Sequence, residues 1–237
     1  VVLNVTVTEP RAAGYVTVFR CGASVPSTST VNFVAGETIA AMATVGLGGG
    51  SVCVAASATT HLVVDVDGAY SPTAGTTVLT PVSPVRAMDT RVGGAARPTG
   101  GVQVLSLASL AAVPPSATAV VLDVAVDAPA RAGFVTVYPC EGGRPLASNL
   151  NATGGETASN AVTVRLGAAR EVCIFSSMPA HVVVDVMGVY LPGEARPMRS
   201  LDARVLDTRV AGSGGRLTAG VVRVVDVGEP GRVVVLN

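Results

Sequence analysis

Two histidines, each followed four residues later by an aspartate, are the residues best suited to chemistry. They are His61 with Asp65 and His181 with Asp185. On a strand, residues four apart share a face, so each pair is expected on one side of a sheet. Hydrolysis would need a nucleophile within reach of the histidine, and the sequence has no Gly-x-Ser-x-Gly motif and no reactive cysteine. We therefore expect no enzyme activity, and interpret the aspartates as a polar outer face or as partners of Arg91 and Arg209.

Alternating carboxylates before a glycine make Asp65-Val66-Asp67-Gly68 a calcium candidate, because carboxylate oxygens suit a hard cation. The matching string, Asp185-Val186-Met187-Gly188, lacks the second carboxylate. No Glu follows at the distance that an EF-type loop requires. Calcium at Asp65 and Asp67 is thus a candidate in the first repeat alone, and no other metal or cofactor is expected.

An Asp-Thr-Arg string occurs twice where a strand pattern gives way to a glycine-rich loop. The copies are Asp89-Thr90-Arg91 and Asp207-Thr208-Arg209. An Asp there accepts backbone hydrogen bonds and fixes the turn, Thr does so more weakly, and the arginine can pair with a strand carboxylate. We interpret these residues as one structural polar motif, comprising Asp65, Asp89, Arg91, Asp185, Asp207 and Arg209.

Four cysteines fall two to a repeat, and four cysteines allow three pairings. Repeat symmetry favours Cys21–Cys53 and Cys140–Cys173, because each module should close its own loop. Oxidised pairs indicate an extracellular compartment. The alternative is four reduced core cysteines in a cytosolic protein.

Aromatic residues are scarce, with no Trp, four Tyr and four Phe. Most recur in matched pairs within strand patterns, and we expect them in the core: Tyr15/Phe134, Phe19/Tyr138 and Tyr70/Tyr190. Sugar binding would then fall to Asn, Ser and Arg side chains in loops.

These residues come in pairs because the chain repeats itself. The stretch from Val1 to Cys21 returns from Val120 to Cys140, and a third copy begins at Val234. Short valine-rich runs, broken by turn signals about every 8–12 residues, predict strands of a sandwich or barrel. The fold class we predict is all-β, with tandem Ig-like β-sandwich modules of about 115–120 residues.

Linker-like composition at residues 71–77 and 191–197 places the module boundaries near residues 72 and 192. Residues 1–72 are then an incomplete module, 73–192 a complete one, and 193–237 the first part of another. An incomplete sandwich leaves unpaired strand edges. Residues 193–237 are therefore expected to complete residues 1–72 of a neighbouring copy or of the same chain, unless the chain is a window of a longer array.

Charge and hydropathy exclude several classes of protein. Sixteen basic and sixteen acidic residues cancel, so no net field attracts nucleic acid or an anionic membrane. No run approaches the roughly 18 apolar residues of a membrane helix. The chain begins at Val1 without a leader sequence, and we expect a processed product or a fragment.

Several strings together resemble a repeat family of secreted actinobacterial proteins: residues 2–10, 14–18, 148–151, 181–190 and 206–209. In that family a Leu-Asp-Thr-Arg segment opens a module and an Asp-Val-x-Gly-Tyr segment closes it. The first repeat departs from the pattern, since Thr30 and Val31 replace Asn149 and Leu150, and Met88 replaces the Leu of the opening segment. If those asparagines bind something, the first repeat has lost part of the site.

The resemblance implies extracellular arrays, or modules attached to cell-wall and polysaccharide hydrolases, without catalytic activity of their own. We therefore expect a structural or interaction protein of a surface layer, fibre or filament, in which copies associate head to tail by strand complementation. The alternative is a polysaccharide-binding accessory module of a secreted hydrolase.

Overall fold

The computed structural model describes residues 1–26, 29–70, 77–92, 100–193, 198–199, 203–208, 210 and 213–226. For residues 70, 81, 198–199, 203–205 and 207 it describes the backbone without the side chains. The protein is all-β: among the described residues there is no α-helix, and a short 3₁₀ helix spans Cys140–Gly142 (η2). The chain forms two compact units, Val1–Ala74 with Met198–Asn237, and Gly75–Pro197. We name these unit 1 and unit 2.

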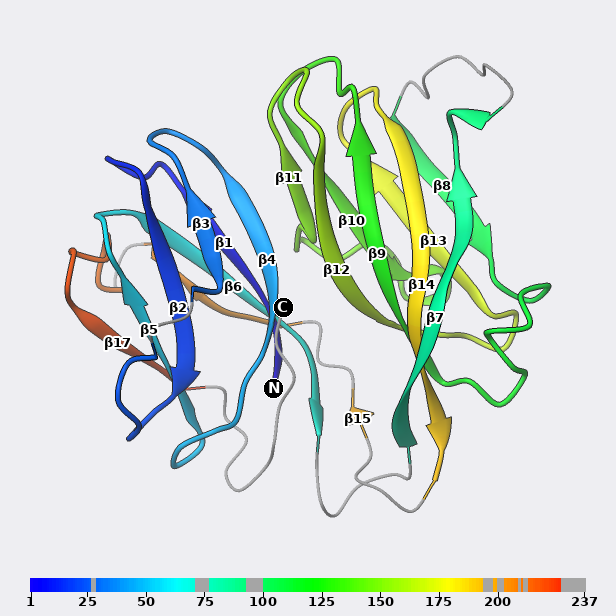
Figure 1. Ribbon diagram of the computed structural model, residues 1–237, viewed down its shortest axis with the longest axis horizontal. Helices are drawn as coiled ribbons and strands as arrows, with labels where there is room; N and C mark the ends of the chain where they lie inside the picture. Colours follow the sequence, from blue (N-terminus) through cyan, green and yellow to red (C-terminus); the bar gives the residue numbers. More distant parts are fainter. Residues whose placement is uncertain are drawn as a thin grey trace. The chain divides into compact units, whose positions relative to one another are not determined.

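Unit 2 consists of two antiparallel four-stranded sheets (Figure 1). The first has the order β12-β9-β14-β7 and contains β7 (Thr77–Asp89), β9 (Ala119–Asp127), β12 (Ala158–Arg165) and β14 (His181–Pro192). The second has the order β11-β10-β13-β8 and contains β8 (Gly101–Ser106), β10 (Gly133–Pro139), β11 (Leu150–Ala152) and β13 (Glu171–Ser176).

Alternation along the strands builds the core of unit 2. On β9, Val120, Leu122, Val124 and Val126 are fully buried, whereas the residues between them are more exposed. They share one hydrophobic cluster with residues of the opposite sheet, such as Ile174. Branched side chains suit such a surface because they pack well on a pleated sheet.

Unit 1 repeats this arrangement. Its first sheet has the order β15-β6-β1-β4, with β16 also paired to β6, and contains β1 (Val2–Thr8), β4 (Ile39–Thr44), β6 (His61–Tyr70), β15 (Met198–Arg199) and β16 (Ala203–Asp207). Its second sheet has the order β17-β5-β2-β3 and contains β2 (Gly14–Arg20), β3 (Val31–Phe33), β5 (Ser51–Ala56) and β17 (Val222–Asp226).

The C-terminal strands of unit 1 pair with its N-terminal strands within the same chain. β16 pairs with β6 as β7 pairs with β14, and β17 pairs with β5 as β8 pairs with β13. Figure 1 shows β17 in red beside β5 in cyan. Leu217 and Val225 join the core cluster that contains Leu3 and Val5. Within this chain, the C-terminal strands thus extend both sheets of unit 1.

Candidate functional site

The Asp-Thr-Arg turn of unit 2 is a dense cluster of hydrogen bonds at the end of β7. Asp89 Oδ1 accepts from the Arg91 backbone N (3.0 Å) and Nε (2.9 Å). Asp89 Oδ2 accepts from Arg91 Nη2 (2.8 Å) and Arg86 Nη1 (2.6 Å). One carboxylate therefore binds both the turn that follows it and the arginine three residues before it.

Arg91 connects this turn to the neighbouring strands. Its Nη1 lies 3.3 Å from Asp127 Oδ2 at the end of β9, and Thr157 Oγ1 donates to Asp127 Oδ1 (2.7 Å). Three segments distant in sequence thus share one polar network. The arginines Arg86 and Arg91 are 49% and 45% exposed, and an ion pair with an exposed partner contributes little to stability by itself.

Asp185 pairs with Arg86 and not with Arg91, which the sequence had offered as its partner. Arg86 Nε donates to Asp185 Oδ1 (2.6 Å) and Nη2 to Oδ2 (3.3 Å). The register explains the difference, because a bulge between Val184 and Asp185 sets Arg86 opposite Asp185. A bulge changes the direction in which a side chain points.

The network shifts the pKa values of its members in directions that follow from these contacts. The hydrogen bonds from Arg91 hold the pKa of Asp89 well below its usual range, and the pKa of Arg91 is raised in return. The hydrogen bond from Thr157, followed by that from Arg91, lowers the pKa of Asp127. All three groups therefore stay charged across the physiological range.

Asp123 behaves in the opposite way. It lies on β9 directly opposite Asp185 on β14. Partial burial, and then the negative charge of Asp185, raise the pKa of the Asp123 carboxyl. Burial disfavours the charged form of a carboxyl group, and a neighbouring like charge adds to that effect.

Thr90 and His181 form the other half of this turn. Thr90 N donates to Val182 O (3.1 Å), and Thr90 Oγ1 accepts from Val182 N (2.8 Å). The threonine side chain therefore extends the hydrogen bonding between β7 and β14 by one residue past the end of β7. His181 Nδ1 lies 3.2 Å from Thr90 O. The same Nδ1 lies 3.3 Å from Thr90 Oγ1, so the histidine either donates to the carbonyl oxygen or accepts from the hydroxyl, according to its tautomer. His181, one of the two histidines considered for catalysis, therefore contacts the Asp-Thr-Arg turn.

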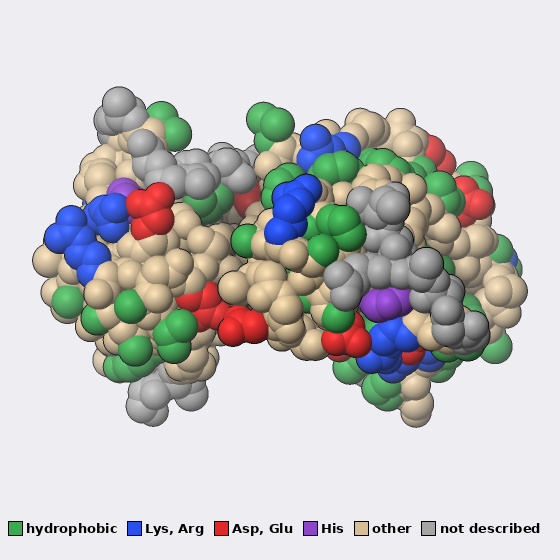
Figure 2. Space-filling model, turned by 90° about the horizontal axis from the view of Figure 1, so that it is seen from above, with side chains coloured by type: hydrophobic (Ala, Val, Ile, Leu, Met, Phe, Trp, Pro, Cys, Tyr) green, Lys and Arg blue, Asp and Glu red, His purple; other side chains and the backbone are tan. Residues whose placement is uncertain are grey.

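Unit 1 has the equivalent threonine and histidine contacts. Thr208 N donates to Leu62 O (3.0 Å), Thr208 Oγ1 accepts from Leu62 N (3.0 Å), and His61 Nδ1 lies 3.2 Å from Thr208 Oγ1. His61 Nε2 is 4.0 Å from Glu9 Oε2, which also binds Arg216 Nη2 (2.9 Å). Figure 2 shows, in each unit, a histidine with acidic and basic side chains beside it.

The remaining predicted polar residues belong to unit 1. Asp207 pairs with Val63 through the backbone of β16, and its side chain and the whole of Arg209 lie outside the described residues. Asp65 and Asp67 lie on β6 and are buried, with 2% and 9% of their surface exposed. Among the described residues, no group of three or more His, Cys, Asp or Glu side chains is placed to hold a metal ion.

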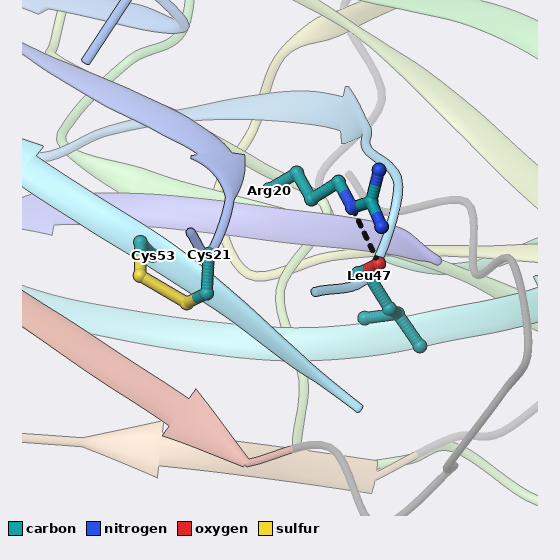
Figure 3. The surroundings of a disulfide bond; sticks show 4 residues. All are labelled: Arg20, Cys21, Leu47 and Cys53. Carbon is teal, nitrogen blue, oxygen red and sulfur yellow. Dashed lines mark hydrogen bonds between the residues drawn. A yellow bond between two sulfur atoms is a disulfide. The ribbon is translucent and has the colours of Figure 1, made fainter. Parts of the chain in front are cut away.

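The cysteine pairing predicted from the repeat is confirmed. Disulfides join Cys21 to Cys53 and Cys140 to Cys173, with Cα–Cα distances of 4.9 and 5.0 Å. Figure 3 shows the first of them, near the hydrogen bond from Arg20 Nε to Leu47 O (3.0 Å). Two disulfides are typical of a protein in an oxidising environment.

The asparagine that distinguishes the two repeats has a structural task that sequence reasoning missed. Asn149 Oδ1 accepts from Val137 N (2.7 Å), which extends the pairing of β10 beyond the short strand β11. In unit 1, Thr30 Oγ1 accepts from Val18 N (2.9 Å) at the matching place. Thr30 therefore replaces Asn149 in this bond, and the substitution does not remove it. The sequence feature that could have indicated this role is that Asn149 and Thr30 each come directly before a short strand.

The aromatic residues are distributed differently from the core placement that we expected. Tyr15 is 46% exposed, and Phe134 is half-buried and absent from the core cluster. The rings of Phe134 and Phe175 lie 5.7 Å apart, and the guanidinium of Arg144 lies 4.0 Å from the Phe175 ring centre. The prediction was wrong for this pair because consecutive strand residues point to opposite faces, and these rings are on the outer one.

Phe19, Tyr138 and Tyr190 are buried. Phe19 lies opposite Cys53, and Tyr138 opposite Cys173. The side chain of Tyr70 lies outside the described residues.

Within the described ranges, no helix has the length and apolar character needed to cross a membrane. No family model, curated protein or solved structure matches this chain.

Proposed function

We propose that this chain is a non-catalytic, secreted structural or interaction protein, built from tandem Ig-like β-sandwich modules that associate into a surface layer, fibre or filament. The observation that carries the proposal is the equivalence of the two units. The two sheets of one unit have counterparts in the other with the same strand order, and β15 and β16 together take the place of β7 beside β6. Repeated modules of this kind commonly extend a structure.

The contacts of the recurring polar residues favour a structural role over an enzymatic one. Each histidine contacts the threonine of an Asp-Thr-Arg turn. Asp185 is bound by Arg86 and Asp89 by Arg91. The residues that repeat most faithfully are thus engaged in holding strands and turns together.

The pairing of β16 and β17 within one chain affects how copies would associate. Head-to-tail complementation would require exchange, in which residues 198–226 of one copy leave β5 and β6 and pair with those strands of another. Association through surfaces that remain exposed needs no such exchange. We therefore propose that copies associate through exposed surfaces, while β16 and β17 stay paired within each chain.

The test is the oligomeric state of the purified 237-residue chain. Sedimentation velocity over a wide concentration range, with negative-stain imaging, is expected to show a growing series of assemblies. A monomer at every concentration would exclude the filament.

A second function, as a polysaccharide-binding accessory module, is favoured by the outer aromatic group of unit 2. Phe134, Phe175 and Arg144 combine half-buried rings with an exposed cation. Retention on peptidoglycan or insoluble glycans, lost in Phe175→Ala, would support it. The absence of retention on every glycan tested would remove it.

A further inference from the structure

Strands β8 and β17 are the terminal strands of equivalent sheets, and both expose valines on the outer face. Val102 and Val104 on β8 are 55% and 58% exposed, and Val222 and Val224 on β17 are 44% and 62% exposed. The register places them identically: Val104 lies opposite Cys173, and Val224 opposite Cys53. The same apolar strip therefore occurs once in each unit.

β8 lacks the features with which proteins usually protect a sheet edge, and β17 has few of them beside its two exposed valines. Edges are commonly blunted by short strands, prolines, bulges or charged residues. β8 is six residues long, without proline, charge or register shift. β17 contains two charged residues. Arg223 donates to the backbone oxygens of Ser213 and Gly214 (2.9 Å each), so its charge is directed at a loop of its own unit, and the exposed Asp226 is the last residue of the strand, beyond both valines.

The other edges of unit 2 carry such protection. β7 contains Pro81 and Pro84, and its pairing with β14 has two irregularities. β11 is three residues long, and Asn149 binds the backbone next to it. β12 ends in the exposed Arg165. The exposed valines are therefore concentrated on the least protected edge.

We propose that β8 of one copy pairs with β17 of a second copy, which joins two four-stranded sheets across the contact. This inference rests on the proposed self-association and names the surfaces that carry it. Addition of a strand to an exposed edge supplies main-chain hydrogen bonds, and the side chains beside it supply specificity.

The sequence of β17 favours this pairing over the pairing of two β17 strands. An antiparallel register with Val102 opposite Val224 also sets Val104 opposite Val222. Two β17 strands related by a two-fold axis would set Arg223 against itself, or Val222 against Asp226. Like charges directly opposite each other are destabilising. A contact between unlike edges is heterologous, so each copy keeps one edge of each kind for further growth.

The experiment uses the full chain and two variants, Val102→Lys with Val104→Lys, and Val222→Lys with Val224→Lys. All four positions are largely exposed, so the fold should survive, which circular dichroism and the mass of the oxidised protein would verify. Each variant alone is expected to sediment as a monomer at concentrations where the wild type assembles. A mixture of the two is expected to form a one-to-one dimer, because one intact β8 then meets one intact β17.

The matched control is Val25→Lys with Val34→Lys, two similarly exposed valines away from both edges (51% and 60%). It should assemble like the wild type. If both edge variants fold and still assemble like the wild type, the edge assignment is wrong while the proposed self-association stands. A β17 variant that stays dimeric, without rescue on mixing, would overturn the pairing of unlike edges. A wild type that is monomeric at every concentration would overturn the proposed self-association as well.

Discussion

Thr208 Oγ1 accepts the backbone N–H of Leu62 at 3.0 Å, although 146 residues separate the two in sequence. The bond connects the second part of unit 1 to β6 at the point where β16 ends. Thr90 and Val182 make the same bond in unit 2 at 2.8 Å. The threonine of the Asp-Thr-Arg string therefore closes the edge of a sheet in both repeats.

Replacing Thr208 by Val is expected to destabilise unit 1 by about 1–3 kcal/mol, because it leaves the buried Leu62 N–H without an acceptor. Urea unfolding monitored by circular dichroism measures the loss. Thr208→Ser keeps the hydroxyl and should recover most of the stability. A Val variant as stable as the wild type, with the loss confined to the Ser variant, would show that the methyl group, and not the hydrogen bond, is what matters.

Replacing Asn149 by Ala should cost unit 2 about 1–3 kcal/mol, because the buried Val137 N–H loses its acceptor. Asn149→Thr copies Thr30 of unit 1, which bonds Val18 N in the same way. The Thr variant is therefore expected to be clearly more stable than the Ala variant in urea titrations. The prediction fails if the two variants unfold at the same urea concentration.

Asp89 should make the stability of unit 2 depend on pH in the acid range. Its folded-state pKa is depressed by the hydrogen bonds from Arg91, so its contribution is present above the usual carboxyl pKa of about 3.9 and is lost as the pH falls below it. Asp89→Asn is expected to lower Tm at neutral pH, with the difference from wild type shrinking towards pH 2. Thermal unfolding from about pH 7 to pH 2 checks this.

The control for this series is Glu156→Gln, an exposed carboxyl that should give no comparable pH-dependent difference. A constant gap between wild type and Asp89→Asn at every pH would contradict the proposed role of ionised Asp89.

The contribution of Asp123 to stability should depend on pH in the opposite direction. Its pKa is raised by burial and by Asp185, so its contribution to stability is favourable below the usual carboxyl pKa and is lost as the pH rises through the raised value. Asp123→Asn should therefore raise the Tm of unit 2 at neutral pH by about 1–2 °C, with the gain disappearing in acid. Unit 1 already carries the amide there, since Asn4 lies opposite Asp65 as Asp123 lies opposite Asp185. A lower Tm for Asp123→Asn at neutral pH would refute this account.

Short-range patterns in the sequence were sufficient to predict the strands and the disulfides. Alternating valines have the period of a strand, and the matched spacing of Cys21 and Cys53 with Cys140 and Cys173 indicated the pairing that the structure has. Both inferences depend on local spacing or on internal symmetry, which a single chain displays directly.

The partners of the polar residues depended on register, which the sequence does not reveal. Asp185 lies opposite Arg86 because of one bulge, and the corresponding irregularity sets Arg204 opposite Asp65 in unit 1. A shift of one residue moves a side chain to the other face of a sheet. For the same reason Phe134 and Tyr15 lie outside the cores although their strands are apolar.

By itself, then, the sequence determined that the protein is an all-β repeat with one disulfide in each repeat, because strand period and repeat spacing are properties of neighbouring residues and of copies. Only the tertiary structure decided that β16 and β17 pair with β6 and β5 of the same chain, and that apolar strips remain on β8 and β17. The physical reason is that strands of either origin satisfy the same backbone hydrogen bonds. The sequence motifs are therefore the same in both cases, and only the three-dimensional arrangement shows which chain supplies the strands.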